Sequence, residues 1–431
     1  MFQGVSIKQR LSRTTANVVD SVTKKPYELI FGLCVFVVAA SGGALNHAAS
    51  ASLAIVVLAG LFYIRNWPAA WRELSSLSRL VLIGFALYTF SAFLSYWNVQ
   101  DVQEYLKDLD RYFRYLAIVP VYLLISREKL NLFPYLLAGA VVSGPVYLII
   151  TLQSLSQNPG LPALGAYHHI TFGDMAMLSA MFMATVLVLM RLSYLKKAVL
   201  AVSIICLLYA SVMSQARGAW LALPFCMSLL LFVALRNNKI KLRTVIIALV
   251  ALAAVIAASP VKDVVTSRIN EAKQEIGLYQ QDGLHDTSIG IRLELWRFAV
   301  DVWKEYPVVG TGPGDFDLEL LAQKKAESFG HFSNYSNVHN IYLQALANTG
   351  SVGFIILCLA LFIFPFILFY RSYKENHNVA SLCGMVTLTA FAIFGVTETW
   401  TLRAPMVSSY LLFIVSFATA AAAKKNNPVK V

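Results

Sequence analysis

Long apolar segments recur along most of the 431-residue chain, and they constrain the fold more than any other feature. Each is about 17 to 25 residues long, which is the length that an α-helix needs to cross roughly 30 Å of hydrocarbon. Hydrophobic residues make up 58% of the chain and charged residues only 13%, as is typical of integral membrane proteins. The segments do not alternate in polarity as barrel strands do, so we expect an all-α polytopic membrane protein.

The apolar pattern predicts twelve transmembrane helices. They cover residues 27–45, 48–64, 80–97, 112–125, 133–153, 172–190, 198–213, 218–235, 244–259, 341–370, 379–396 and 405–423. The fourth is the shortest, and the tenth is longer than one crossing requires, with Pro365 as the place for a kink. The chain then divides into an N-terminal tail, a first membrane region, a polar segment, a second membrane region and a C-terminal tail, at residues 1–26, 27–259, 260–338, 339–423 and 424–431.

Lysine and arginine residues orient the bundle, because they accumulate in the short cytoplasmic loops of membrane proteins. They occur in both tails and in every second loop, as at Arg65, Arg127, Lys196 and Lys239. We therefore expect both termini in the cytoplasm and residues 260–338 on the outer side. The net charge of +12 follows from this topology and from attraction to anionic membrane lipids, so it indicates no nucleic-acid partner.

The outer segment of residues 260–338, between spans nine and ten, is the only part large enough for a soluble subdomain. With about eighty residues it is too small for a large core of its own, so we expect it to fold onto the bundle as a helical cap. Apolar residues recur at helical spacing over residues 288–304, which predicts a central helix. A more polar helix is predicted over residues 263–279 and a short one over residues 315–328.

The five cysteines all fall inside predicted spans, which indicates small core residues and not a disulfide framework: Cys34, Cys206, Cys226, Cys358 and Cys383. The sequence has no CxxC, HExxH or phosphate-loop signature. We therefore predict neither a metal nor a cofactor.

Two arginines on the outer side are candidates for an anion-binding site. Arg292 lies in the first turn of the central cap helix, where the helix dipole disfavours a cation, and no acidic residue lies three or four positions away. Arg217 lies in the short outer turn between spans seven and eight, where basic residues are disfavoured. The alternatives are an idle exposed side chain for Arg292 and snorkelling to the head groups for Arg217.

Three histidines lie on the same outer side. His339 opens the tenth span; a neutral imidazole there can accept a proton from an attacking hydroxyl, and the alternative is a hydrogen-bonding anchor at the membrane surface. His168 and His169 lie in another outer loop, and one of the two is expected to face a site because adjacent helical residues point about 100° apart. Residues 310–315, rich in glycine, form either a phosphate cradle or, more simply, a turn between helices.

These features resemble the O-antigen ligase and polymerase superfamily of bacterial envelope enzymes, and specifically the lipopolysaccharide O-antigen ligases. His339 and Asn340 are followed after nine residues by Gly350 and after two more by Gly353, which is similar to the histidine motif of that family. The glycine-rich stretch at residues 305–316, and twelve spans with one large outer loop, are similar as well.

The resemblance implies inverting transfer of O-antigen polysaccharide from undecaprenyl pyrophosphate to a sugar hydroxyl of lipid A-core, at the periplasmic face of a Gram-negative inner membrane. His339 is then the general base, and Arg217 and Arg292 hold the pyrophosphate, without metal or cofactor. Glu398 matches an acidic residue that the family carries near the eleventh span, although nearby Arg403 offers a simple ion pair. The residues expected to support the site are Asn340, His168, His169, Gly350 and Gly353.

Two other classes of function stay open on the sequence. One is a polymerase or a protein O-oligosaccharyltransferase with the same lipid-linked donor. The latter often has a large C-terminal soluble part, and the last predicted span here ends within about ten residues of the final residue, which argues against that class. The other is a polysaccharide transporter or flippase. Transporters usually bury ionisable residues near mid-membrane, and here Asp174 and Glu398 come closest to that position. The sequence indicates neither the sugars nor the oligomeric state.

Overall fold

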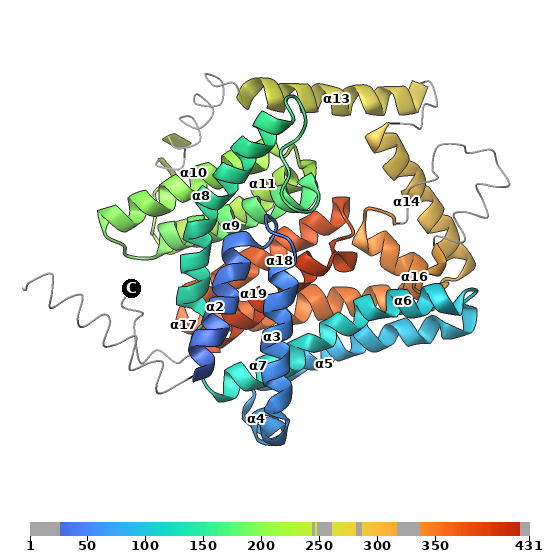
Figure 1. Ribbon diagram of the computed structural model, residues 1–431, viewed down its shortest axis with the longest axis horizontal. Helices are drawn as coiled ribbons and strands as arrows, with labels where there is room; N and C mark the ends of the chain where they lie inside the picture. Colours follow the sequence, from blue (N-terminus) through green and yellow to red (C-terminus); the bar gives the residue numbers. More distant parts are fainter. Residues whose placement is uncertain (1–25, 244–245, 248–260, 282–286, 317–336, 423–431) are drawn as a thin grey trace, which may run out of the picture.

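The computed structural model describes residues 26–243, 246–247, 261–281, 287–316 and 337–422. Within these ranges the regular structure is entirely helical (Figure 1), which confirms the predicted all-α class for this part of the chain. In chain order the α-helices are α2 (Pro26–Ser41), α3 (Ala48–Phe62), α4 (Trp67–Glu73), α5 (Ser76–Ser91), α6 (Val102–Phe113), α7 (Ile118–Arg127), α8 (Phe133–Gln157), α9 (His169–Leu189), α10 (Tyr194–Met213), α11 (Arg217–Arg236), α13 (Val261–Gln281), α14 (Ser288–Glu305), α16 (Ile341–Leu357), α17 (Phe364–Asn376), α18 (Val379–Thr397) and α19 (Ala404–Ala422).

Eight helices of the described ranges are long and apolar enough to cross a membrane, or nine if the bent pair Ala48–Phe62 and Ile64–Glu73 forms one span. They correspond to predicted spans three, five to eight and ten to twelve, and the bent pair to span two. The shorter apolar helix α2 takes the place of span one, and the fourth is interrupted by a 3-10 turn between α6 and α7. The ninth lies outside the described residues apart from residues 246–247, so the count of twelve stays a prediction.

The tenth predicted span is a long helical run from Ile341 to Asn376 that changes geometry within its length. Residues Cys358–Ile363 form a π-helical segment between α16 and α17, and Pro365 follows in the first turn of α17. A proline at that position costs no intrahelical hydrogen bond, so the irregularity falls just before the predicted kink.

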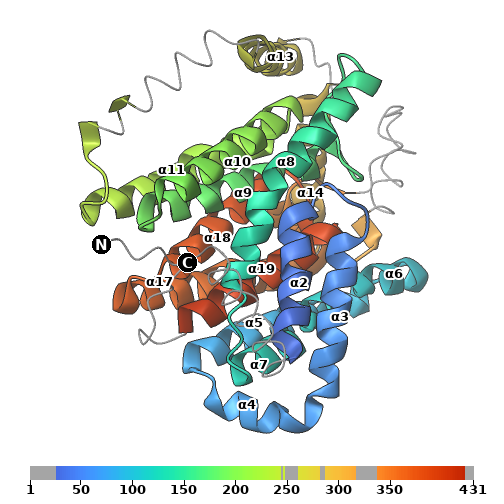
Figure 2. The ribbon, with the colours of Figure 1, turned by 60° about the vertical axis from the view of Figure 1, so that its left-hand side comes forward.

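Helix α19 forms the centre of the bundle (Figure 2). All its residues from Pro405 to Ala421 are buried, as expected for a helix that is apolar on every side. It packs against α18, α3 and α7, among others. The five cysteines carry free thiols, and those of Cys34, Cys226 and Cys383 are buried in this core.

The outward faces of the bundle are strongly apolar. Leu58 on α3, Ile205 on α10 and Phe232 on α11 are 56%, 65% and 61% exposed. Soluble proteins rarely expose so much contiguous apolar surface, whereas lipid tails are a suitable environment for it. The chain is therefore a multi-pass membrane protein.

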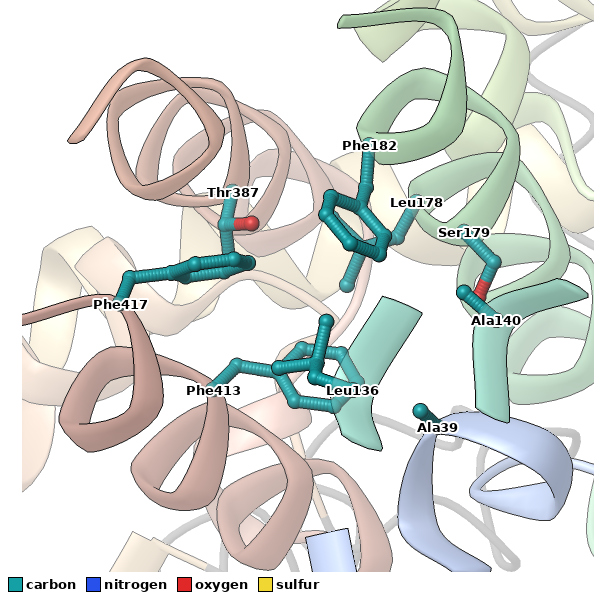
Figure 3. A pocket seen from close by; sticks show the side chains of 9 residues that line it. All are labelled: Ala39, Leu136, Ala140, Leu178, Ser179, Phe182, Thr387, Phe413 and Phe417. Carbon is teal, nitrogen blue, oxygen red and sulfur yellow. The ribbon is translucent and has the colours of Figure 1, made fainter. Parts of the chain in front are cut away.

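A narrow gap lies where α8, α9, α18 and α19 meet, between the aromatic rings of Phe182, Phe413 and Phe417 (Figure 3). It has no room for a water molecule. The Thr387 hydroxyl beside it has no hydrogen-bond partner among the described residues. This gap is a small packing defect between apolar side chains, and it is too small to bind a ligand.

The helices predicted over residues 263–279 and 288–304 are confirmed as α13 and α14, and they lie at one end of the bundle (Figure 1). The hydroxyl of Thr287 caps α14 by accepting a hydrogen bond from the Gly290 amide at 3.0 Å. Helix α14 packs on α16 through a small apolar core of its own: Leu295, Ala299, Val302, Phe316, Val338 and Ala347. The third predicted cap helix lies outside the described residues beyond Phe316, and the side of the membrane on which the cap lies stays a prediction.

Candidate active site

A cavity of about 420 Å³ lies at the end of the bundle beneath α13 and α14. It brings together side chains from α9, α11, α13, α14, the last turn of α18 and His339, which precedes the N-cap of α16. The lining residues are Pro162, His168, His169, Ile170, Gln215, Arg217, Gly218, Arg268, Ser288, Ile291, Arg292, His339 and Thr397. Five predicted site residues are therefore neighbours although they come from distant parts of the sequence.

His339 is held in a constrained position directly before α16. Its backbone has a φ of +52°, a left-handed conformation that non-glycine residues seldom adopt. The side chain of Asn337 accepts a hydrogen bond from the His339 amide at 3.2 Å. Asn340 then caps α16, because its side-chain oxygen accepts from the amides of Tyr342 and Leu343 at 2.9 and 3.1 Å. Asn340 thus supports the site by fixing the point at which the helix begins.

Glu398, at the end of α18, is the nearest charged partner of His339. Its Oε2 atom lies 3.3 Å from His339 Nδ1, and its Oε1 atom lies 3.3 Å from Arg403 Nη2. The simple ion pair with Arg403 and the contact with the motif histidine therefore both exist, on one carboxylate that is only 2% exposed.

The protonation state of Glu398 fixes the tautomer of His339. Burial by itself raises the pKa of Glu398, but the His339 hydrogen bond and the positive charges of His339, Arg403 and Arg292 outweigh burial and lower the pKa to about 2. An ionised carboxylate only accepts hydrogen bonds, so in the neutral imidazole, which is the form that can act as a base, the hydrogen lies on Nδ1 of His339. The lone pair that can take a proton then lies on Nε2.

Gly350 and Gly353 shape α16 below the histidine. Gly350 has a φ of +63° and breaks the helix, and a Cβ there would overlap the carbonyl group of Val308. The loop after α14 enters this break: Ser351 and Val352 donate to the carbonyls of Pro307 and Val308, at 2.9 and 3.1 Å. At Gly353 a Cβ would overlap the Thr349 side chain. Both glycines are structural parts of the motif.

The glycine-rich residues 310–315 belong to the same junction. Thr311 and Gly312 donate to the carbonyls of Ala347 and Asn348 at 3.0 Å each, and Asp315 accepts from the Gln100 amide at 2.7 Å. None of these residues lines the cavity. The stretch therefore forms the predicted turn, which joins α14, α16 and the start of α6, and the phosphate cradle stays untested.

His168 and His169 both line the cavity, so the expectation that only one would face a site is wrong. His168 is the extended N-cap of α9 and only His169 is helical, so the helical offset of about 100° does not apply to the pair. Their ring centroids are 4.3 Å apart, and Nδ1 of His169 lies 2.8 Å from the Ser214 carbonyl oxygen. Partial burial and the charge of His169 lower the pKa of His168 to about 4, so His168 is neutral at physiological pH.

The two predicted arginines both line the cavity. Arg292 reaches it from α14, and its charge acts on Glu398. Arg217 begins α11, and its Nη2 atom lies 3.2 Å from Glu275 and 3.5 Å from Glu271, both on α13. The acidic partners of Arg217 therefore come from a distant part of the sequence.

Two further charged residues at this end of the bundle had no site role assigned from the sequence. Arg268 of α13 lines the cavity and contacts Glu271 at 2.6 Å and the side chain of Gln215. Asp174 of α9 is fully buried, and neither of its carboxylate oxygens has a hydrogen-bond partner among the described residues. The position of Asp174 inside an apolar span was a signal in the sequence, whereas the packing of α13 on α10 and α14 arises only in the folded chain.

The cavity is thus lined by three guanidinium groups and three imidazoles, with a carboxylate behind one of them. Such a set binds an anion and can accept a proton. In the described part of the chain, no three His, Cys, Asp or Glu side chains gather closely enough to hold a metal ion.

The sequence profile described as O-antigen ligase matches residues 202–358. This segment of the chain is therefore similar to the O-antigen ligase family. The matched segment contains all three arginines of the cavity together with His339, Gly350 and Gly353, whereas His168, His169 and Glu398 lie outside it.

The chain is also similar to a protein of Haemophilus influenzae. That protein, described as uncharacterized, is 27% identical over 315 residues, which cover 72% of this chain and 77% of the relative. The similarity extends well beyond the segment that the family profile matches. It therefore includes much of the bundle that positions the cavity.

Proposed function

We propose that the protein is an O-antigen ligase. It transfers O-antigen polysaccharide from undecaprenyl pyrophosphate to a sugar hydroxyl of lipid A-core, at the periplasmic face of the bacterial inner membrane. The observation that carries this proposal is that His339, Arg217 and Arg292 line one cavity. All three residues belong to the segment matched by the family profile. The basic loops predict that this end of the bundle faces the periplasm.

The proposed reaction needs an acceptor for a proton and a stabiliser for a leaving anion. The acceptor hydroxyl attacks the anomeric carbon of the first O-antigen sugar and forms the new C–O bond, while its proton passes to Nε2 of His339. The bond between that carbon and the pyrophosphate oxygen breaks, and its electron pair stays on the pyrophosphate. Attack opposite the leaving group inverts the anomeric configuration.

Arg217 and Arg292 stabilise the charge that develops on the pyrophosphate. A guanidinium presents two parallel N–H donors that match two phosphate oxygens, and a fixed guanidinium needs little reorganisation during the reaction. In this proposal the arginines take the part that a metal ion takes in many phosphate enzymes. Glu398 acts through His339 by holding Nδ1–H, so it is a positioning residue.

The proposal is tested first in a strain that lacks its own ligase. Wild type restores the ladder of polymer-bearing lipopolysaccharide on a gel, and His339→Ala, expressed at the same level in the membrane, does not. A full ladder with the alanine variant rules out His339 as the base. A polymerase is recognised in the same strain, because it lengthens the lipid-linked polymer without transferring it to the core.

The arginines are tested by charge and by shape. Arg217→Lys and Arg292→Lys keep part of the activity, since an ammonium group binds phosphate without the paired geometry, and the alanine variants lose most of it. Arg297→Ala is the matched control, because Arg297 lies on the same helix as Arg292, is exposed and does not line the cavity. Full activity in both alanine variants removes the arginines from the mechanism.

A further inference from the structure

The carboxylate of Glu275 is bound to Arg217 in the way that an anionic ligand would be. Oε1 lies 3.2 Å from Nη2 and Oε2 lies 3.5 Å from Nη1, so both oxygens face the guanidinium fork. The Ile289 amide, in the first turn of α14, donates a further hydrogen bond to Oε2 at 2.8 Å. The side chains of Glu275 and Arg217 are 17% and 23% exposed.

These donors are also suited to a phosphate group. A guanidinium fork binds carboxylate and phosphate with the same paired geometry, and backbone amides of a helix start favour either anion. Arg217 lines the cavity, yet its donors are engaged by a carboxylate of the protein itself. A diphosphate that binds the same fork of Arg217 must therefore replace Glu275.

Helix α13, which carries Glu275, is fastened mainly by polar contacts. None of its side chains in the described ranges is buried, and Ile269 and Ile276 are 48% and 43% exposed. Other polar contacts of α13 are the Tyr279 hydroxyl, which donates to Glu294 at 2.7 Å, Arg268 with the side chain of Gln215, and Glu271, which lies 3.5 Å from Arg217. Releasing Glu275 thus exposes little apolar core, so the contact can open at small cost.

We propose that Glu275 is an internal competitor for the diphosphate of the donor. This inference rests on the proposed function and adds a regulation to it. Without donor, Glu275 neutralises Arg217 and α13 covers the cavity. A diphosphate carries more negative charge than one carboxylate, so it takes the guanidinium from Glu275 and α13 is released on that side.

The test is diphosphate binding by the purified full-length protein, with farnesyl diphosphate as the probe and calorimetry as the readout. Glu275→Gln keeps the shape but removes the charge, and we expect it to bind the probe about tenfold more tightly than wild type, as loss of a charged competitor predicts. Glu275→Gln combined with Arg217→Ala loses this gain, because the competition is for Arg217.

Tyr279→Phe is the matched control. It removes a tie between α13 and α14 without changing a partner of Arg217, so the affinity stays within about twofold of wild type. Thermal unfolding of each variant confirms that it is folded.

The possible outcomes separate this inference from the proposed function. If wild type binds the probe, Arg217→Ala weakens binding and Glu275→Gln binds no better than wild type, Glu275 positions Arg217 and the competition is refuted. An equal gain in Tyr279→Phe also refutes it, since loosening of α13 then explains the effect. If neither folded wild type nor folded Glu275→Gln binds the probe, the pyrophosphate site fails, and the inference fails with it.

Discussion

The Nδ1 atom of His339 lies 3.3 Å from the Oε2 atom of Glu398, across 59 positions of the sequence. The other oxygen of the same carboxylate lies 3.3 Å from Arg403. This buried carboxylate therefore orients the imidazole from behind and directs the opposite ring nitrogen away from it. The contact with Glu398 therefore gives His339 a defined tautomer.

Glu398→Gln should lower the rate of transfer by about 10- to 100-fold with little change in donor KM, as is typical when the partner that orients a catalytic histidine is changed. The measurement is the turnover of equal amounts of folded protein. Glu375→Gln, an exposed residue on α17, is the control and should keep the full rate. An unchanged rate in Glu398→Gln would mean that the carboxylate only pairs with Arg403.

Stability should depend on pH through Glu398. The pKa of Glu398 is lowered to about 2 in the folded protein, whereas a glutamate in the unfolded chain has a pKa of about 4.3. As the pH falls below about 4.3, the unfolded chain therefore binds more protons at this residue than the folded protein does. The stabilisation is fully present above that pH and is lost as the pH falls toward 2. The difference in melting temperature between wild type and Glu398→Gln should therefore be large at pH 6 and shrink at pH 3. A constant difference would contradict an ionised Glu398.

Asn340→Ala should destabilise the protein by about 0.5–2 kcal/mol, since it removes the side-chain cap of α16. It should also lower activity, because His339 directly precedes the cap. Asn340→Asp retains the accepting oxygen, so it should keep much of the stability and much of the activity of wild type. Thermal unfolding and the transfer assay together check this prediction, and an alanine variant with wild-type stability would show that the cap is dispensable.

Gly350→Ala should be strongly destabilising, by about 2–4 kcal/mol, because alanine is strained at positive φ and its Cβ would meet backbone. Gly277 offers a contrasting position on α13, where a Cβ would meet nothing within 4 Å. Gly277→Ala should leave stability unchanged or raise it by up to about 1 kcal/mol, as for glycine in a helix. Similar melting temperatures for the two variants would contradict the role given to the break in α16.

The fold was largely predictable because each helix is determined by a short, continuous stretch of the sequence. Apolar runs of sufficient length define the helices, and the spacing of apolar residues in the cap located α13 and α14 to within a few residues. The sequence also placed His339, Arg217 and Arg292 at one end of the bundle, since loop charges assign the ends of spans. The cavity that these residues line forms where α9, α11, α14 and α18 meet in the folded protein.

What the sequence could not show are contacts between distant segments. Glu275 is 58 positions from Arg217, and nothing in either neighbourhood indicates the pair. Arg268 reaches the cavity because α13 packs on α10 and α14, and no local pattern indicates that packing. Likewise, the break at Gly350 is understandable only with the loop after α14 in place, because that loop supplies the hydrogen bonds that the broken helix loses.

The most direct test of the central claim is transfer by purified protein reconstituted with undecaprenyl-pyrophosphate-linked O-antigen and lipid A-core. We predict that wild type forms core-linked polymer and that folded His339→Ala forms it at least about 100-fold more slowly, the loss expected for a general base. Core-linked polymer formed by His339→Ala at the wild-type rate would contradict the account, and so would wild type that elongates only the lipid-linked donor.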